Sequence, residues 1–338
     1  MEENKHTVED LKQMQNRSFE DKIQTSIAKI LEVFNKYNKQ CYVSFSGGKD
    51  STVLADLVAK CCQLCNCKLV LWYSNTGLEY PEVTKHVKSF SEWLKEKYKI
   101  EVELVIDYPK DKYGNRITFK DVIEKHGYPL ISKEVSRDVA IAKNKPDGKT
   151  AQKFIRGSDY HKKYGDTWLL ERWFYLIDAP FHISNQCCNI MKKTPAHKFN
   201  KKSGMIPIIG TMACESILRK KEWLRSGCNA FDNKTPNSKP LSFWTEQDIL
   251  KYLKQFNIPY PSVYGEIVTD ENGKYFTTGC DRTGCMFCGY GCHLEKDPNR
   301  FQKLKITHPK IWEYCMKPVS DGGLGMREIL EYIGVKVD

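Results

Sequence analysis

The stretch CYVSFSGGKDSTVLADLVAK, residues 41–60, decides the fold more than any other part of the sequence. Its first five residues, 41–45, form a short apolar and aromatic run typical of a buried strand. Four apolar residues then recur at helical spacing, namely Val53, Leu54, Leu57 and Val58. Between them lies Ser-Gly-Gly-Lys-Asp-Ser, residues 46–51. The sequence therefore predicts a strand, a glycine loop and a helix in direct succession.

The alternation of strands and helices continues along the chain. Residues 68–73 and 100–106 predict two further buried strands, and residues 81–98 predict a helix between them. Residues 205–210 are another strand candidate. Strands that alternate with helices are typical of a parallel sheet with helices on both faces. We therefore expect an α/β fold of this kind, plus a Cys-rich C-terminal region.

Two local signals mark the later part of the sequence. Thr245 precedes three polar residues that include two acids, so we expect it to cap a helix that continues to Phe256. Asn272-Gly273 lies between two strand-like runs and predicts a hairpin with a type I′ turn.

The glycine loop has the composition of a phosphate-binding site. Its two glycines let backbone N–H groups approach a phosphate without obstruction by a Cβ atom, and the following helix adds its positive N-terminal end. The two serines can donate hydroxyl hydrogen bonds, the lysine can offset phosphate charge, and the aspartate can cap the helix or help to hold Mg²⁺. The spacing differs from the GxxxxGKS/T loop. The candidate residues are Ser46, Gly47, Gly48, Lys49, Asp50 and Ser51.

These six residues resemble the PP-loop of the adenine nucleotide α-hydrolase superfamily, whose members cleave ATP between the α- and β-phosphates. The resemblance implies that the loop binds ATP, or adenylylsulfate, together with Mg²⁺. It also implies that Lys49 and Asp50 take part in catalysis.

Further segments are similar to one branch of that superfamily, the phosphoadenosine phosphosulfate (PAPS) reductase family. SNTGLEYPE, residues 74–82, is similar to the family's DTGxxFPE segment, although Ser-Asn replaces the first aspartate. PLSFWTEQD, residues 240–248, and the NIPY that follows are similar to its PLxxWTxxDV…IPY stretch. The resemblance covers residues 40–292, about three-quarters of the chain. It implies that Asn75, Thr76 and Gly77 also bind the nucleotide.

The 14 cysteines are clustered, which in a chain of this length indicates metal or redox chemistry. Cys285 and Cys288 form a C-x2-C pair on a glycine-rich loop, and Cys187-Cys188 is an adjacent pair far upstream. Together the two pairs can supply four thiolates to one ion or cluster. The frame resembles the 4Fe-4S frame of the adenylylsulfate reductases, which implies that these four cysteines are the ligands.

Alternatives remain for the ligand set and for the metal. Cys292 closes a compact three-thiol loop with the C-x2-C pair, so it can replace one of the upstream cysteines, and Cys280 is a further candidate. A structural Zn²⁺ site with four cysteine ligands is the competing interpretation of the same residues. The remaining cysteines are expected to pack in the core. Among these are Cys61, Cys62, Cys65 and Cys67, and also Cys41, Cys214, Cys228 and Cys315.

The formal net charge of +11 is compatible with a polyanionic partner. Two basic runs can contact nucleotide phosphate or a nucleic-acid backbone, or can be solvated helix faces. The first contains Lys192, Lys193, His197, Lys198, Lys201 and Lys202, and the second contains Arg219, Lys220, Lys221 and Arg225. Arg219 lies near the position where the PAPS reductase family places an arginine against the phosphate or sulfate end of the nucleotide, which implies a catalytic role.

Two features separate the reactions known in this family. The SGGKDS loop is intact, whereas sulfonucleotide reductases have a degenerate loop, and the reductases' C-terminal ECGLH motif is absent. An intact loop with a cluster frame most resembles the DndC-type proteins of DNA phosphorothioation. The tRNA thiolases use a similar mechanism. The resemblance implies an ATP pyrophosphatase that adenylylates an acceptor and supports sulfur transfer to DNA or RNA. A cysteine desulfurase is then a suitable sulfur donor.

Two other functions remain open. One is reduction of adenylylsulfate or phosphoadenylylsulfate by an external thiol. The other is a non-catalytic, nucleotide-binding role within a larger complex.

The composition and the length also give expectations for the cellular location and the domain organisation. No run approaches the ~20 apolar residues of a membrane span, and the first residues are polar and charged, so we expect a cytoplasmic protein without a membrane partner. At ~150 residues per domain, the length predicts about two domains. We expect an N-terminal helical segment (residues 1–38), a nucleotide-binding α/β domain (residues 39–260) and a cluster-binding C-terminal region (residues 261–338).

Overall fold

The structure is a computed structural model that describes residues 4–149, 151–152 and 172–338. The chain folds into two compact units. Unit 1 consists of Met1–Asn75, Glu79–Asp107 and Ala196–Thr283. Unit 2 consists of Thr76–Leu78, Tyr108–Pro195 and Gly284–Asp338. The domain boundaries expected at residues 38 and 260 stay a prediction.

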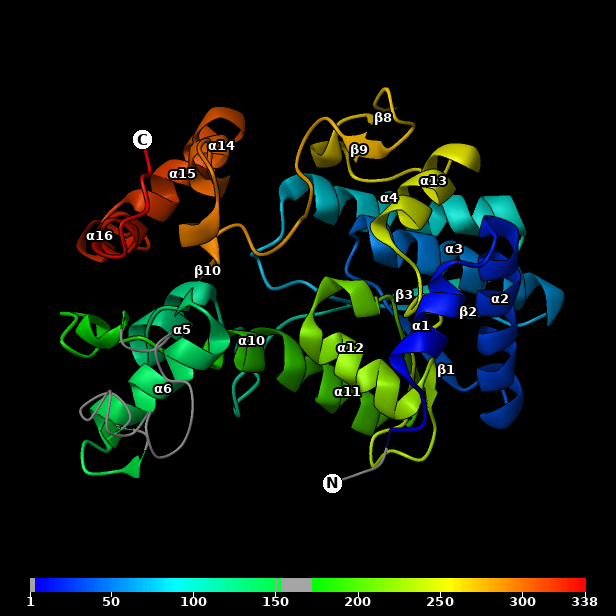
Figure 1. The fold of residues 1–338 in the computed structure, drawn as a ribbon, viewed down its shortest axis with the longest axis horizontal. Helices are drawn as coiled ribbons and strands as arrows, with labels where there is room; N and C mark the ends of the chain where they lie inside the picture. The colour runs from blue at the N-terminus through cyan, green and yellow to red at the C-terminus, as the bar shows by residue number, and fades with distance from the viewer. Residues whose placement is uncertain (1–3, 150, 153–171) are drawn as a thin grey trace. The chain divides into compact units, whose positions relative to one another are not determined.

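Unit 1 is built on a six-stranded sheet with the strand order β3-β2-β1-β5-β7-β6. Figure 1 labels β1, β2 and β3 of this sheet. The strands are β1 (Cys41–Ser44), β2 (Leu69–Ser74), β3 (Val102–Asp107), β5 (Ile206–Ile209), β6 (Asn229–Ala230) and β7 (Asn237–Ser238). All neighbouring pairs are parallel except β6 and β7. The predicted α/β fold and its four predicted strands are therefore confirmed.

Alternate residues of the strands point to opposite faces of this sheet, and both faces are covered. Val43 is paired with Leu71, and both are fully buried in the main core. Tyr42 and Trp72 belong to a separate cluster, where Phe199 lies 4.8 Å and 5.7 Å from their rings. Apolar side chains on both faces explain why these strands read as continuous apolar runs in the sequence.

Helices of unit 1 pack around the sheet. They are α1 (Val8–Gln15), α2 (Phe19–Lys36), α3 (Lys49–Leu64), α4 (Pro81–Tyr98), α12 (Ile217–Ser226) and α13 (Glu246–Gln255). Helix α11 (Thr194–Ser203) begins in unit 2 and contributes Phe199 to the sheet. Thr245 caps α13 through a capping box with Asp248, as predicted. Within the described ranges, every helix is too short or too polar to span a lipid bilayer.

Helix α3 is anchored by a buried carboxylate at its middle. Asp56 is fully buried and accepts hydrogen bonds of 2.7 Å from both Tyr98 and Tyr252. Its charge is balanced by Lys97 at 3.1 Å and by Lys60 at 3.5 Å. Removing one member of such a buried network typically costs ~3–5 kcal/mol. The network therefore fixes the position of the helix that begins at the glycine loop.

The hairpin after α13 has a different turn from the one predicted. Strands β8 (Ile267–Thr269) and β9 (Tyr275–Thr277) are antiparallel, so the hairpin itself is confirmed. Gly273 donates a 3.0 Å hydrogen bond to the Asp270 carbonyl and has φ +75°, whereas Asn272 is not in the left-handed region. A type I′ turn requires positive φ at both central residues, so the predicted turn type is wrong. The longer loop is organised by Asp270, whose side chain accepts from two backbone N–H groups.

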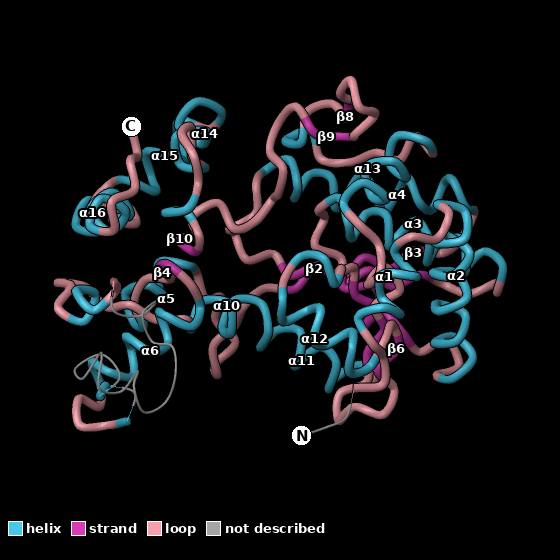
Figure 2. Tube along the Cα trace, viewed as in Figure 1, coloured by secondary structure: helices cyan, strands magenta, loops and turns pink. Residues whose placement is uncertain are grey.

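Unit 2 is mainly helical. Its helices are α5 (Phe119–His126), α6 (Lys133–Asn144), α10 (Gln186–Cys188), α14 (Arg300–Thr307), α15 (Pro309–Met316) and α16 (Met326–Tyr332). The short strands β4 (Leu130–Ile131) and β10 (Gly289–Tyr290) pair in parallel. Both are labelled in Figure 2, where they lie side by side. This pair joins the C-x2-C region to the segment between α5 and α6.

Candidate functional site

The glycine loop lies at the point where the strand order of the sheet reverses. From β1 the chain proceeds to β2 and β3 on one side, and β5 lies on the other side of β1. In open parallel sheets, ligands bind outside the carboxyl ends of the strands at such a switch point. Residues 45–48, which connect β1 to α3, occupy this position.

Close packing explains why the loop needs glycine. Gly47 has φ +75°, and a Cβ atom there would lie 2.6 Å from a methyl carbon of Val87. Gly210, just after β5, faces the backbone of Asp50, which a Cβ atom would meet at 3.2 Å. A larger residue at either position therefore has to displace α4 or the start of α3.

The serines of the loop are held by each other and by the backbone. The hydroxyl oxygens of Ser46 and Ser51 lie 3.0 Å apart, and Ser51 also donates to the Gly48 carbonyl at 3.0 Å. Gly48 is the N-cap of α3 and makes no side-chain capping bond. The positive end of α3 is therefore directed at the loop without a carboxylate cap of its own.

Lys49 is buried at the first position of α3 and is held by residues distant in sequence. Its ammonium group lies 2.9 Å from the Asp281 carbonyl and 3.2 Å from the Glu246 carboxylate. Its backbone N–H donates to the Tyr264 hydroxyl at 3.2 Å. Burial works to lower the pKa of Lys49, but Asp50, Tyr264 and Glu246 outweigh that effect and raise the pKa. The site therefore holds a permanent positive charge.

Asp50 provides a buried carboxylate beside this charge. Its Oδ1 atom is buried and has no hydrogen-bond partner among the described residues. Burial raises the pKa of Asp50, although Lys49, Arg282 and Arg219 counteract the shift. A buried carboxylate oxygen without a partner is a suitable ligand for Mg²⁺, which takes carboxylate oxygens together with phosphate oxygens.

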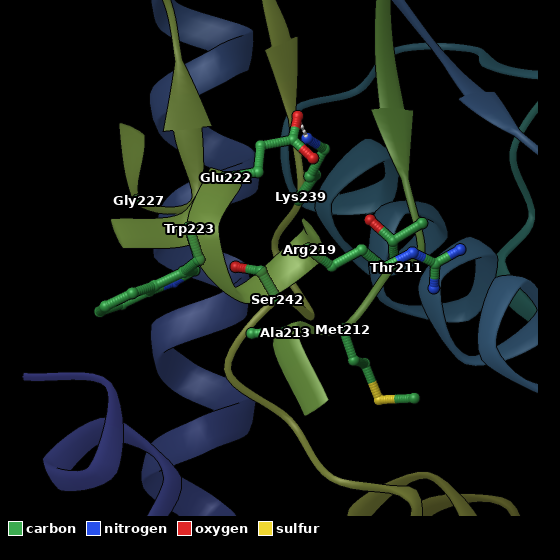
Figure 3. Close-up of a pocket in the computed structure, with 9 residues that line it drawn as sticks. All are labelled: Thr211, Met212, Ala213, Arg219, Glu222, Trp223, Gly227, Lys239 and Ser242. Atoms are coloured by element: carbon green, nitrogen blue, oxygen red, sulfur yellow. Dashed lines mark hydrogen bonds and ion pairs between the residues drawn. The ribbon is translucent and has the colours of Figure 1, made fainter. Parts of the chain in front are cut away.

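Arg219 extends from α12 towards Thr211 at the edge of a small cavity (Figure 3). It pairs with Glu215 in the short 3-10 turn just before α12, and Glu222 on α12 pairs with Lys239. Burial lowers the pKa of Arg219, and Arg282 lowers it further, while Asp50 has the opposite effect. Arg219 and Arg282 therefore both lie within electrostatic range of Asp50.

The residues after β2 are divided between the two units. Asn75 ends the β2 segment in unit 1, where its backbone N–H donates to the Asp107 carbonyl at 2.8 Å. Thr76 and Gly77 belong to unit 2. The Thr76 hydroxyl accepts from the Leu78 N–H at 3.2 Å, and Gly77 has φ +75°.

Unit 2 gathers the four thiols of the Cys187-Cys188 and C-x2-C pairs. Burial raises the pKa of the Cys187 thiol, and the nearby Cys285, Cys188 and Cys288 add to the shift. Burial likewise raises the pKa of Cys288 to about 11, with contributions from Cys285 and Cys188. Thiols from two distant parts of the sequence are therefore electrostatic neighbours.

Cys292 lies beside this group, but its thiol is hydrogen-bonded to the backbone. It is fully buried, and its thiol donates to the Gly289 carbonyl at 3.0 Å. Arg300 donates to the Cys288 carbonyl at 3.1 Å and pairs with Glu295, which fixes the loop from the other side. Cys280 lies in unit 1, whereas the other five candidate thiols lie in unit 2.

The backbone that supports these thiols is strained at one position. Ile131 in β4 has φ +62°, which is a rare conformation for a β-branched residue. Its carbonyl accepts a 2.9 Å hydrogen bond from the Gly291 N–H, next to Cys292. Met286, inside the C-x2-C pair, donates to the Leu78 carbonyl at 2.8 Å. The loop is thus held at both ends by backbone hydrogen bonds.

A zinc ion and a 4Fe-4S cluster require different separations of their thiol ligands. Within the described parts of the chain, no three His, Cys, Asp or Glu side chains converge closely enough to hold one metal ion. Four thiolates on one zinc must lie about 4 Å apart, because each sulfur is ~2.3 Å from the metal. A 4Fe-4S cluster binds each cysteine through a different iron, which allows wider separation.

Comparison with known proteins identifies the family of this chain. The phosphoadenosine phosphosulfate reductase domain family matches residues 40–147 and 131–290, about three-quarters of the sequence. The chain belongs to this family. The resemblance expected from residues 74–82 and 240–248 is therefore confirmed.

The curated relatives of this PAPS reductase family member are longer proteins. An uncharacterized protein of Methanocaldococcus jannaschii is 23% identical over 85% of this chain and 43% of its own length. A second one from the same organism is 22% identical over 93% of this chain and 57% of its own length. The chain therefore spans about half the length of the curated relatives it matches.

Solved structures with some likeness to this family member share low sequence identity with it. The U34-tRNA thiolase NcsA from Methanococcus maripaludis, solved with its 4Fe-4S cluster, is 15% identical, with a TM-score of 0.36 over 71% of this chain and 66% of that chain. NMN synthetase from Francisella tularensis is 12% identical, with a TM-score of 0.33 over 72% and 73%. NAD⁺ synthetase from Burkholderia pseudomallei is 13% identical, with a TM-score of 0.35 over 75% and 72%.

Sequence reasoning missed several residues around the loop of this PAPS reductase family member. They are Glu246, Tyr264, Asp281, Arg282 and Thr283. A signal was present in TTGCDRTG, residues 277–284, which is polar and glycine-containing and directly precedes the C-x2-C pair.

Proposed function

We propose that this protein is a PP-loop ATP pyrophosphatase that adenylylates an acceptor and supports sulfur transfer to nucleic acid. The proposal rests on the charged groups that surround the glycine loop. A buried lysine and two arginines lie around one buried carboxylate, at the switch point of a parallel sheet. This arrangement suits a polyphosphate bound with Mg²⁺.

Each loop residue has a role in this proposal. The backbone of Gly47 and Gly48 approaches the phosphates, while Ser46 and Ser51 donate hydroxyl hydrogen bonds. Lys49 stabilises the charge that develops on the departing pyrophosphate, and Asp50 orients Mg²⁺. Arg219 binds the terminal phosphates. The rest of the nucleotide is bound by Asn75, Thr76 and Gly77.

The thiol group of unit 2 is proposed to hold a 4Fe-4S cluster through Cys187, Cys188, Cys285 and Cys288. Such a cluster supplies a site at which sulfur can be bound and activated. Support comes from the mutual proximity of the four thiols, which belong to two distant parts of the sequence. Cys292 is proposed to fix the loop through its hydrogen bond to Gly289.

The acceptor is proposed to be DNA or RNA. The exposed basic side chains that follow the Cys187-Cys188 pair can contact a phosphate backbone. They are Lys192, Lys193, His197, Lys198, Lys201 and Lys202. A cysteine desulfurase is the proposed sulfur donor.

Family membership favours a second candidate function, the reduction of adenylylsulfate or phosphoadenylylsulfate. This reaction needs a thiol that can attack sulfate sulfur. Cys315, the last cysteine of the sequence, is fully buried, and burial raises the pKa of its thiol. A buried neutral thiol is a poor nucleophile, so Cys315 does not supply the attacking thiol for this reaction.

Sulfur incorporation tests the proposed function directly. Anaerobically purified protein is incubated with ATP, Mg²⁺, a cysteine desulfurase, labelled cysteine and either DNA or transfer RNA. We expect label in the nucleic acid only when ATP is present. Sulfite release from adenylylsulfate with a thiol, without labelled nucleic acid, would instead establish the reductase.

A further inference from the structure

A second group of thiols lies at the C-terminal end of α3, far along the helix from the glycine loop. Its members are Cys41, Cys61, Cys62, Cys65 and Cys67. The sequence predicts that they pack in the core, and the structure shows Cys41, Cys61 and Cys62 buried. Cys65 and Cys67, however, are half-exposed, so solvent reaches one side of the group.

The end of α3 brings Cys62 and Cys67 together. Asn66 has φ +48°, and the Cys67 N–H donates to the Cys62 carbonyl at 3.0 Å. This hydrogen bond spans the left-handed residue and is characteristic of a Schellman motif, in which the two bonded positions also make a side-chain contact. Here the two positions are Cys62 and Cys67, whose thiols are electrostatic neighbours, and the Cys62 thiol donates to the Lys68 carbonyl at 3.6 Å.

The two thiols differ in their exposure to solvent and in the groups that shift their pKa values. Burial raises the pKa of Cys67, and the neighbouring Cys62 thiol and Lys39 ammonium group counteract the shift only in part. Burial strongly raises the pKa of Cys62, which is 1% exposed. Cys67 is therefore the more accessible of the two thiols, and Cys62 is its protected neighbour.

We propose that Cys62 and Cys67 form a reversible dithiol–disulfide site that reacts with small-molecule disulfides. The pair lies on the opposite end of α3 from Lys49, and a helix of 16 residues is about 24 Å long. The pair is thus at the far end of α3 from the proposed nucleotide loop, and it does not depend on the proposed function.

The reaction is a two-step thiol–disulfide exchange. The Cys67 thiolate attacks one sulfur of the external disulfide, forms a mixed disulfide and releases one thiolate. The Cys62 thiolate then attacks the Cys67 sulfur and releases the second thiolate. The protein loses two electrons and two protons, and the external disulfide becomes two thiols.

The sequence allows a direct test by peptide mapping. Trypsin cleaves after Lys60 and Lys68, so CCQLCNCK, residues 61–68, is released as one peptide. The full-length protein is treated with oxidised glutathione, alkylated and digested, and this peptide is analysed by mass spectrometry. We expect it to carry two fewer alkyl groups, with Cys62 and Cys67 protected, and reduced glutathione to reverse the change.

Three serine variants make the assignment falsifiable. Cys67→Ser and Cys62→Ser should each leave the peptide without a disulfide, whereas Cys65→Ser should retain it. The half-exposed Cys67 tolerates serine without a buried polar group, so that variant is expected to fold. Full alkylation after oxidation, a stable glutathione adduct, a disulfide in Cys67→Ser, or its loss in Cys65→Ser would each overturn the proposal.

Discussion

Lys49→Ala is expected to lower kcat/KM for ATP cleavage by about 10²–10³-fold, the usual effect of removing one preorganised donor to developing charge. The side chain is 4% exposed and lies between Glu246 and the Asp281 carbonyl, so its charge is fixed in place. Most of the loss is expected in kcat, because the charge on the departing pyrophosphate grows during the reaction. The rate of AMP formation at several ATP concentrations measures this effect.

Lys95→Ala is the matched control for this substitution. Lys95 is an exposed lysine on α4, and its removal changes the net charge by the same amount. We expect unchanged kinetics for this variant and a similar thermal unfolding midpoint for both. An active Lys49→Ala protein, with kcat/KM within about twofold of the wild-type value, is incompatible with the proposed role of the loop.

Cys288→Ser is expected to abolish assembly of the cluster. Anaerobically purified wild-type protein should contain about four iron atoms and matching acid-labile sulfide, and the variant should contain less than about one iron atom. The physical reason is that serine provides no thiolate at the centre of the thiol group, where Cys288 neighbours both Cys285 and Cys188. Iron, zinc and sulfide analysis of both proteins measures the effect.

Cys292→Ser provides the comparison within the same loop. A serine hydroxyl can also donate to the Gly289 carbonyl, so this variant should keep its iron. Loss of iron in Cys292→Ser with retention in Cys188→Ser would show that Cys292 is a ligand instead. Stoichiometric zinc without iron in the wild-type protein would refute the cluster altogether.

Local sequence patterns predicted the central part of the fold correctly. Residues 41–60 contain a strand, a glycine loop and a helix in direct succession, and each has its own short-range signal. Strand β1 has apolar residues on both faces, which fits its central position between β2 and β5. The predicted type of the turn after Thr269 is wrong because Asn-Gly favours a type I′ turn only in a two-residue loop, and the observed loop is longer.

The surroundings of the loop could not be predicted because they depend on long-range contacts. Lys49 and Tyr264 are separated by 215 positions, and Lys49 and Asp281 by 232. No periodicity in the sequence specifies which distant polar residues reach a given loop. Likewise, the four cysteines of residues 61–67 looked like core residues, and only the positive φ of Asn66 brings Cys67 back to Cys62.

The position of bond cleavage in ATP tests the central claim most directly. Purified protein is incubated with Mg²⁺ and ATP labelled at the α-phosphate, with and without DNA or RNA, and the products are separated. The proposed function predicts unlabelled pyrophosphate together with labelled adenylyl groups, either as free AMP or attached to the acceptor, with faster formation when the acceptor is present. Labelled ADP with inorganic phosphate, or no turnover with any acceptor while adenylylsulfate binds tightly, would contradict it.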